Sequence, residues 1–197
     1  MGGGRGRLDA LKNLPPPDRY DPRIQLQGAE VAEYSQDYQR ERAPAQAASE
    51  RATALGANRL FAEATIHLGW ALTSLGLLPD AKDAFSKAYS VYAQSGEAAG
   101  VADAQNGLAD VLTLQDRLDE ALKNYEESLK VCRELEYQRM TVDNLYGLGD
   151  VSEAHEYLAG ASTQYLQCLK GANRSEYRSG SVQTLLSLAR LSLEQQP

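Results

Sequence analysis

The sequence predicts an all-α protein, a right-handed superhelical solenoid of about four stacked antiparallel helical hairpins. Two observations predict this fold. From Ile24 onward the chain is rich in Ala, Leu, Glu and Gln, and its apolar residues recur three and four positions apart, without strand-type alternation. When the chain is compared with itself at an offset of 40 residues, the same residue types recur in the same columns without gaps. Because a single hairpin buries only one flank, such repeats are stable when they stack.

The columns of the repeat describe two helices that pack closely. A leucine is followed at once by a small residue, which lets a second helix approach, and a later alanine has an aromatic residue four positions on. The first helix carries Leu68, Leu108, Leu148 and Leu188, followed by Gly69, Ala109, Gly149 and Ala189. The second helix carries Ala81, Ala121 and Ala161, followed by Phe85, Tyr125 and Tyr165. Each repeat is therefore expected to be one helical hairpin.

These columns also predict where the elements lie. First helices are expected near 60–75, 99–115, 139–155 and 179–195, and second helices near 40–55, 79–95, 118–135 and 158–173. Residues 1–23 are rich in Gly and Pro and are expected to form a flexible arm. Residues 24–197 form the repeat domain, divided into a degenerate first repeat (24–58), three repeats (59–98, 99–138 and 139–178) and a terminal helix (179–197).

Two places depart from the regular pattern. In the first copy, Pro44 interrupts a helix that begins early, so the helix is expected either to start near Pro44 or to kink there. In the third copy, Ser152 replaces the leucine of the other copies, and no Gly or Asp precedes Leu158. A tighter or irregular loop is therefore expected around Glu156.

The residues that recur in these columns resemble the tetratricopeptide repeat, whose pattern runs W-x2-L-G-x2-Y, then A-x3-F, then P. Leu68-Gly69 with Ala81 and Phe85 matches it, as do the equivalent residues of the next two copies. The tryptophan and the final proline of the pattern are missing. The period of 40 exceeds the usual one of about 34 residues, a longer variety that resembles repeat arrays of bacterial signalling proteins. The resemblance implies a binding role.

Composition narrows the classes of partner. Lys and Arg total 20 and Asp and Glu total 27, a formal net charge of −7, which argues against nucleic acid as the partner. No apolar stretch is long enough to span a bilayer, and the start lacks the apolar core of a secretory signal. With two cysteines and two isolated histidines, we expect no zinc site, no cofactor, no catalytic constellation and a cytoplasmic location. Cys132 and Cys168 are expected to be packed thiols.

In arrays of this type the first helices line a concave face, and the resemblance assigns particular helix positions to that groove. The candidate partner-binding residues are Glu63, Ile66, Trp70, Asp103, Asn106, Asp110, Asp143, Tyr146, Asp150, Glu153 and Arg190. Most of their charges are negative, so the groove is expected to bind a basic or amphipathic peptide. Glu63, Asp103 and Asp143 lie in first turns, where the helix dipole alone favours an acid. Asp110 and Asp150 lie mid-helix in register, where Asp is a poor helix former.

Three functional hypotheses remain open at this point. The leading one is a protein-interaction scaffold or adaptor. The others are a regulatory or sensor segment of a larger bacterial signalling protein, and a chaperone for secreted proteins built from tetratricopeptide repeats. An effector domain recovered as partner would favour the second, and several secreted substrates the third.

The terminal helix carries its own expectation. Residues 182–193 have apolar side chains on more than one stripe, whereas a terminal repeat usually has a polar outer face. We therefore expect this helix to pack against another subunit, a partner or a continuation of the chain.

Overall fold

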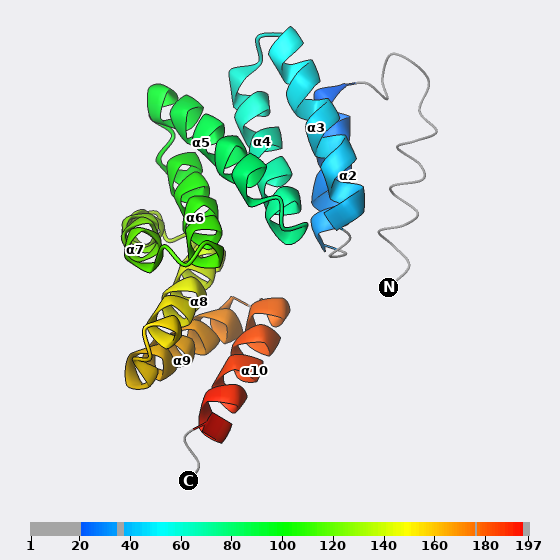
Figure 1. Ribbon diagram of the computed structural model, residues 1–197. Helices are drawn as coiled ribbons and strands as arrows, with labels where there is room; N and C mark the ends of the chain where they lie inside the picture. Colours follow the sequence, from blue (N-terminus) through cyan, green and yellow to red (C-terminus); the bar gives the residue numbers. More distant parts are fainter. Residues whose placement is uncertain (1–20, 35–37, 176, 195–197) are drawn as a thin grey trace. The chain divides into compact units, whose positions relative to one another are not determined.

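A computed structural model describes residues 21–34, 38–175 and 177–194, and every regular element within these ranges is a helix (Figure 1). The helices are α2 (Pro22–Tyr34), α3 (Tyr38–Ala54), α4 (Asn58–Ser74), α5 (Leu78–Ser95), α6 (Ala98–Leu114), α7 (Leu118–Glu134), α8 (Gln138–Ala154), α9 (Leu158–Arg174) and α10 (Arg178–Glu194). The all-α class is confirmed, and the expected helix limits agree with these bounds to within two residues.

The chain divides into two compact units, Met1–Gly107 and Leu108–Pro197, and the division falls inside α6. In the first unit, α3 packs against α2 and α4, α5 packs against α4, and α2 also contacts α4. In the second unit, α7 to α10 contact one another in chain order, and α8 also contacts α10. In both units a first helix thus touches the first helix of the next hairpin, which is how stacked hairpins bury their open flanks.

The turns between helices share one geometry. In each turn a backbone N–H just after the helix donates to the carbonyl five residues earlier, as in Leu77 N to Leu72 O (2.9 Å) and Tyr157 N to Ser152 O (2.8 Å). The residue directly before this N–H adopts the left-handed conformation, so left-handed residues recur at 20-residue intervals. Among the described residues, those with positive φ are Gly56, Gly76, Gly96, Asp116, Glu136 and Glu156. The expectation of a tighter or irregular loop at Glu156 is wrong, because a glutamate there adopts the same conformation as the glycines.

The N-terminal part differs from expectation in two details. Helix α3 begins at Tyr38 and contains Pro44, so the alternative of a start near Pro44 is wrong. Helix α2 begins at Pro22, so the last two residues of the expected arm are helical, and residues 1–20 lie outside the described residues. Asp21 caps α2, since its Oδ1 accepts a hydrogen bond from the Arg23 N–H (2.9 Å). Hydrogen bonds from Arg23 lower the pKa of Asp21 to about 2.

The aromatic column of the second helices packs into the small column of the first helices. A β-carbon placed on Gly69 would lie 2.6 Å from Cε1 of Phe85, and one on Gly149 would lie 2.4 Å from Cε1 of Tyr165. Phe85 and Tyr165 are fully buried. The leucine-plus-small pattern of the sequence therefore encodes the contact between the two helices of one hairpin.

Candidate functional site

The structure distributes the predicted groove residues over both units. In the first unit, Glu63, Ile66 and Trp70 lie on α4, and Asp103 and Asn106 lie on α6. In the second unit, Asp110 lies on the part of α6 that follows Gly107, and Arg190 lies on α10. The remaining residues, Asp143, Tyr146, Asp150 and Glu153, lie on α8.

In the first unit, some of the predicted groove residues pack against other residues of the protein. The Trp70 ring meets Phe85 edge-on, with ring centroids 4.9 Å apart and planes at 70°. Ile66 and Asn106 are each only 4% exposed and so present little surface to a partner. Two of the predicted acids, Glu63 and Asp103, act on the same tyrosine. Burial, followed by the charges of Glu63 and Asp103, raises the pKa of Tyr92 well above its ordinary value.

In the second unit, Asp110 is held by the following helix. Its Oδ1 accepts a hydrogen bond from the hydroxyl of Tyr125 on α7. Burial raises the pKa of Asp110 to about 7, the Tyr125 hydrogen bond opposes that rise, and the charges of Asp143 and Asp150 add to it. The carboxylate of Asp110 on α6 therefore interacts electrostatically with those of Asp143 and Asp150 on α8.

Asp150 repeats this arrangement one hairpin later. The hydroxyl of Tyr165 on α9 lies 2.5 Å from Asp150 Oδ1 and 2.9 Å from Glu153 Oε2. A phenol has one hydrogen, so Tyr165 donates to one of these carboxylates at a time. Arg190 on α10 donates to Glu153 Oε2 at 2.8 Å. Burial raises the pKa of Asp150 to about 6, and the Tyr165 hydrogen bond opposes that rise.

The acidic set also has an aromatic neighbour on α8. The Tyr146 ring lies 5.5 Å from the Tyr165 ring, centroid to centroid. The Tyr146 and Ser187 hydroxyl oxygens lie 3.0 Å apart, which links α8 to α10. We call Asp110, Asp143, Asp150 and Glu153 the acidic face of the second unit. It combines four carboxylates with the partly buried Tyr146 ring and with Arg190, which pairs with Glu153.

Sequence reasoning placed the aspartates in register but missed their tyrosine partners. The missed signal is a spacing of 15 residues between two columns of the repeat. Asp110 pairs with Tyr125 and Asp150 with Tyr165, whereas in the earlier copy Trp70 pairs with Phe85. Where the first-helix residue is apolar its partner is apolar, and where it is acidic its partner carries a hydroxyl.

The cysteines are packed, as expected. Both Cys132 and Cys168 are buried and unbridged. Cys168 Sγ lies 3.0 Å from Thr184 Oγ1, and burial raises the pKa of Cys168 to about 11. Among the described residues, no group of three or more His, Cys, Asp or Glu side chains is placed to hold a metal ion. No described helix has the length and apolar character needed to cross a membrane.

The repeat is also found by comparison with known proteins. Residues 100–174 match the family model described as Tetratricopeptide repeat. Over these residues the chain is similar to tetratricopeptide repeats. The match spans most of the expected repeats at 99–138 and 139–178, and it leaves out the degenerate first repeat, the repeat at 59–98 and the terminal helix. A search of curated protein sequences finds no match.

Two solved structures have the same fold. The crystal structure of BtubC (BKLC) from P. vanneervenii is similar over 98% of this chain and 91% of its own, with a TM-score of 0.65 and 14% sequence identity. The Rap protein complexed with Competence and Sporulation Factor is similar over 97% of this chain and 57% of its own, with a TM-score of 0.59 and 17% identity. The chain therefore has a tetratricopeptide-type helical repeat fold. This fold is generally non-catalytic, and together with the repeats it supports a protein-interaction scaffold in general terms.

Proposed function

We propose that this tetratricopeptide-type chain is a non-catalytic, cytoplasmic interaction scaffold whose acidic face binds a basic or amphipathic peptide segment of another protein. The observation that carries the proposal is the repeated aspartate of the second unit. Asp110 and Asp150 are each oriented by a buried tyrosine hydroxyl, and the fold raises the pKa of both carboxyl groups. A raised pKa means that the folded chain is less stable when these carboxyl groups are charged. A cation supplied by a partner would offset that loss of stability.

Further features support this proposal. The net charge of −7 attracts cations and raises the rate of encounter with a basic segment. Tyr146 is near enough to Asp150 and Arg190 for both charges to act on its hydroxyl, and its ring can contact the stem of a Lys or Arg side chain. In the first unit, Glu63, Trp70 and Asp103 remain candidate contacts, whereas the buried Ile66 and Asn106 have little surface to add. The unbridged thiols suit a reducing compartment.

A regulatory or sensor segment is the second candidate, and one observation favours it. The similar Rap protein was crystallised in complex with Competence and Sporulation Factor, so a chain of similar fold binds a named factor. The chain spans 57% of the length of that Rap chain. Identification of the recovered partner separates the two, since an effector domain points to regulation and a basic segment within unrelated proteins points to a scaffold.

Charge reversal at the acidic face is the test of the proposal. Short peptides that differ in the number and position of Lys and Arg are first screened against the full chain, and the best binder is titrated by calorimetry. The double variant Asp110→Lys, Asp150→Lys should lose at least about tenfold in affinity. Wild-type binding should weaken as salt rises, because exposed charges are screened.

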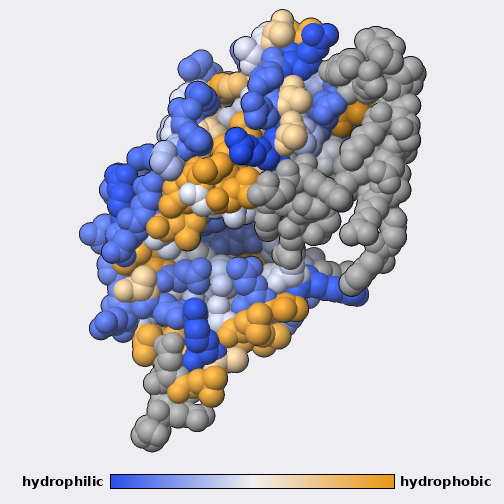
Figure 2. All heavy atoms as spheres, turned by 45° about the vertical axis from the view of Figure 1, so that its right-hand side comes forward, coloured by the Kyte–Doolittle hydropathy of each residue, from blue (hydrophilic) through white to orange (hydrophobic). Residues whose placement is uncertain are grey.

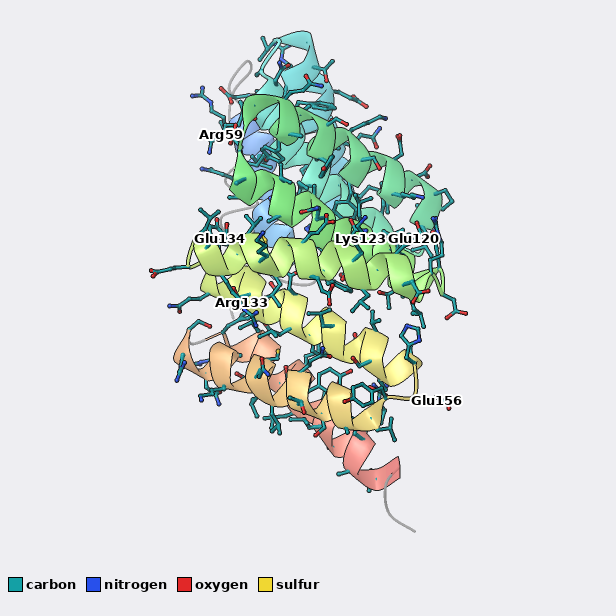
Figure 3. The ribbon with its side chains drawn as sticks, turned by 90° about the vertical axis from the view of Figure 1, so that its left-hand side faces the viewer. Arg59, Glu120, Lys123, Arg133, Glu134 and Glu156 are labelled. Atoms are coloured by element: carbon teal, nitrogen blue, oxygen red, sulfur yellow. The ribbon has the colours of Figure 1, made fainter. Side chains whose placement is uncertain are left out.

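The matched control reverses two exposed acids on the second helix α7, Glu127 and Glu134. Figure 3 shows Glu134 near the C-terminal end of α7, beside Arg133. This pair carries the same change of net charge but lies outside the acidic face, so its variant should bind within about twofold of the wild type. Equal losses from both double variants, with helicity intact in both, would remove the acidic face as the binding site.

A further inference from the structure

The first unit has a pocket lined by residues of α3, α4 and α5. Its volume is about 370 Å³, within the range of pockets that hold small ligands. Figure 1 shows α3 and α5 on either side of α4, and Figure 2 shows hydrophobic residues among hydrophilic ones at the height where Figure 1 places these helices. The pocket thus lies where two second helices flank the first helix between them.

Two positions of this pocket hold short polar side chains where other repeats have large ones. The column of Ser49 continues with Tyr89, Leu129 and Leu169, and the column of Thr65 continues with Gln105, Leu145 and Leu185. In the second unit, Leu129 and Leu145 are 6% and 7% exposed and belong to one core cluster. The serine and the threonine therefore leave open the space that a pair of leucines fills in the second unit.

The two hydroxyl groups give the pocket a defined hydrogen-bonding point. The Thr65 hydroxyl donates to the Phe61 carbonyl (2.6 Å), and the Thr65 and Ser49 hydroxyl oxygens lie 3.3 Å apart. A hydroxyl has one hydrogen, so Ser49 is the donor in its bond with Thr65. The Ser49 oxygen can then accept a hydrogen bond through its lone pairs. The pocket therefore suits a ligand that brings an O–H or N–H to Ser49.

Apart from Thr65, the α4 residues that line the pocket are apolar. Leu72 is 5% exposed, and Phe61 and Leu68 are half-buried. The exposed charged residues of the lining are Arg42 and Glu50 on α3 and Asp80, Asp83 and Lys87 on α5. Charges of both signs give little preference for a charged ligand, and the Phe61 ring can pack against a second ring. An uncharged ring that carries a hydrogen-bond donor therefore suits the pocket.

We propose that this pocket binds a tyrosine side chain of a partner polypeptide. The ring packs on the apolar side chains of α4, and the phenol donates its hydrogen to the Ser49 hydroxyl oxygen. The repeat itself has this residue type at the same position, since Tyr89 follows Ser49 in the column. The site lies in the first unit and does not depend on the acidic face of the second.

N-acetyltyrosinamide is the probe, and N-acetylphenylalaninamide is its matched comparison. Each is titrated into the full isotope-labelled chain and followed by NMR. For a ligand of this size a dissociation constant of about 1–10 mM is expected, with saturable shifts at Ser49, Phe61, Thr65 and Leu68. The tyrosine derivative should bind about two to ten times more tightly than the phenylalanine derivative, the usual effect of one hydrogen bond.

Two variants of the chain separate the space from the hydrogen bond. Ser49→Leu restores the residue type of Leu129, so it should lower the affinity for the tyrosine derivative at least about tenfold without lowering the thermal unfolding temperature. Ser49→Ala keeps the space and removes the acceptor, so it should bind the two derivatives within about twofold of each other. The control is Ser90→Leu, at an exposed serine of α5 outside the pocket, which should bind as the wild type does.

Other occupants of the pocket would give different results. Equal affinity of the wild type for both derivatives, or unchanged binding by Ser49→Leu, would overturn the proposal. Nuclear Overhauser effects between Phe61 and residues 1–20 in the free chain would overturn it as well, because they would assign the pocket to the chain's own N-terminal residues. A dimer in sedimentation that Ser49→Leu dissociates would instead assign the pocket to a second copy and would also contradict the proposal.

Discussion

Gly149→Ala should destabilise the second unit by about 1–3 kcal/mol, the usual cost of overpacking a core. The added β-carbon would lie 2.4 Å from Cε1 of Tyr165. That ring is fully buried, and its hydroxyl is engaged by Asp150 and Glu153, so it has no room to yield. Urea unfolding of the variant and the wild type measures the difference.

Gly160→Ala is the control, with a nominal clash of the same size. Its β-carbon would lie 2.2 Å from Cε1 of Tyr157, but that side chain is 64% exposed and can rotate away. Replacing glycine by alanine inside a helix then stabilises by about 0.5–1 kcal/mol. The two substitutions should have opposite signs. Stabilisation by both would show that the small column is not what fixes the distance between α8 and α9.

Asp110→Asn should stabilise the chain at about pH 7.5 by roughly 1–2 kcal/mol. The amide oxygen can still accept the Tyr125 hydrogen bond, while the partly buried charge and its repulsion from Asp143 and Asp150 are removed. Because Asp110 keeps some contact with solvent, the expected gain is well below the value that its full pKa shift would give. Chemical unfolding at fixed pH measures this gain.

The same substitution should change how stability depends on pH. The pKa of Asp110 in the folded chain is about 7, above its ordinary value of 3.8, so the folded state binds the proton more tightly between these values. Wild-type stability should therefore fall as pH rises from about 4 to about 7 and then level off. Asp110→Asn should flatten this slope. An equally steep slope in the variant would show that Asp110 is not the titrating group.

The fold was predictable because its signal is redundant. A leucine followed by a small residue, as in Leu68-Gly69, and an aromatic residue, as at Phe85, recur at 40-residue intervals, and each copy indicates the same contact between two helices. The left-handed turn was predictable at Gly76 but not at Glu156, because a glutamate carries no local sign of positive φ. There the requirement comes from the hydrogen bond that closes the turn, from Tyr157 N to Ser152 O.

The candidate site was predictable only in part. Helical register alone places Asp110 and Asp150 at equivalent positions on their helices, so the pattern of charges could be read from the sequence. Their hydrogen bonds to Tyr125 and Tyr165 depend on how one helix packs on the next, which the period within a helix does not encode. The burial of Ile66 follows from the same packing.

The most direct test is a carbon-13 titration of the Asp110 and Asp150 carboxyl groups in the full chain, with and without the basic peptide selected above. In the free chain their pKa values should be about 7 and about 6. A Lys or Arg brought beside them favours the carboxylate, so bound peptide should lower both pKa values, and the peptide should bind more tightly at about pH 7.5 than at about pH 5. Carboxyl pKa values that are the same with and without peptide, together with an affinity independent of pH, would contradict the proposal that these aspartates bind the partner.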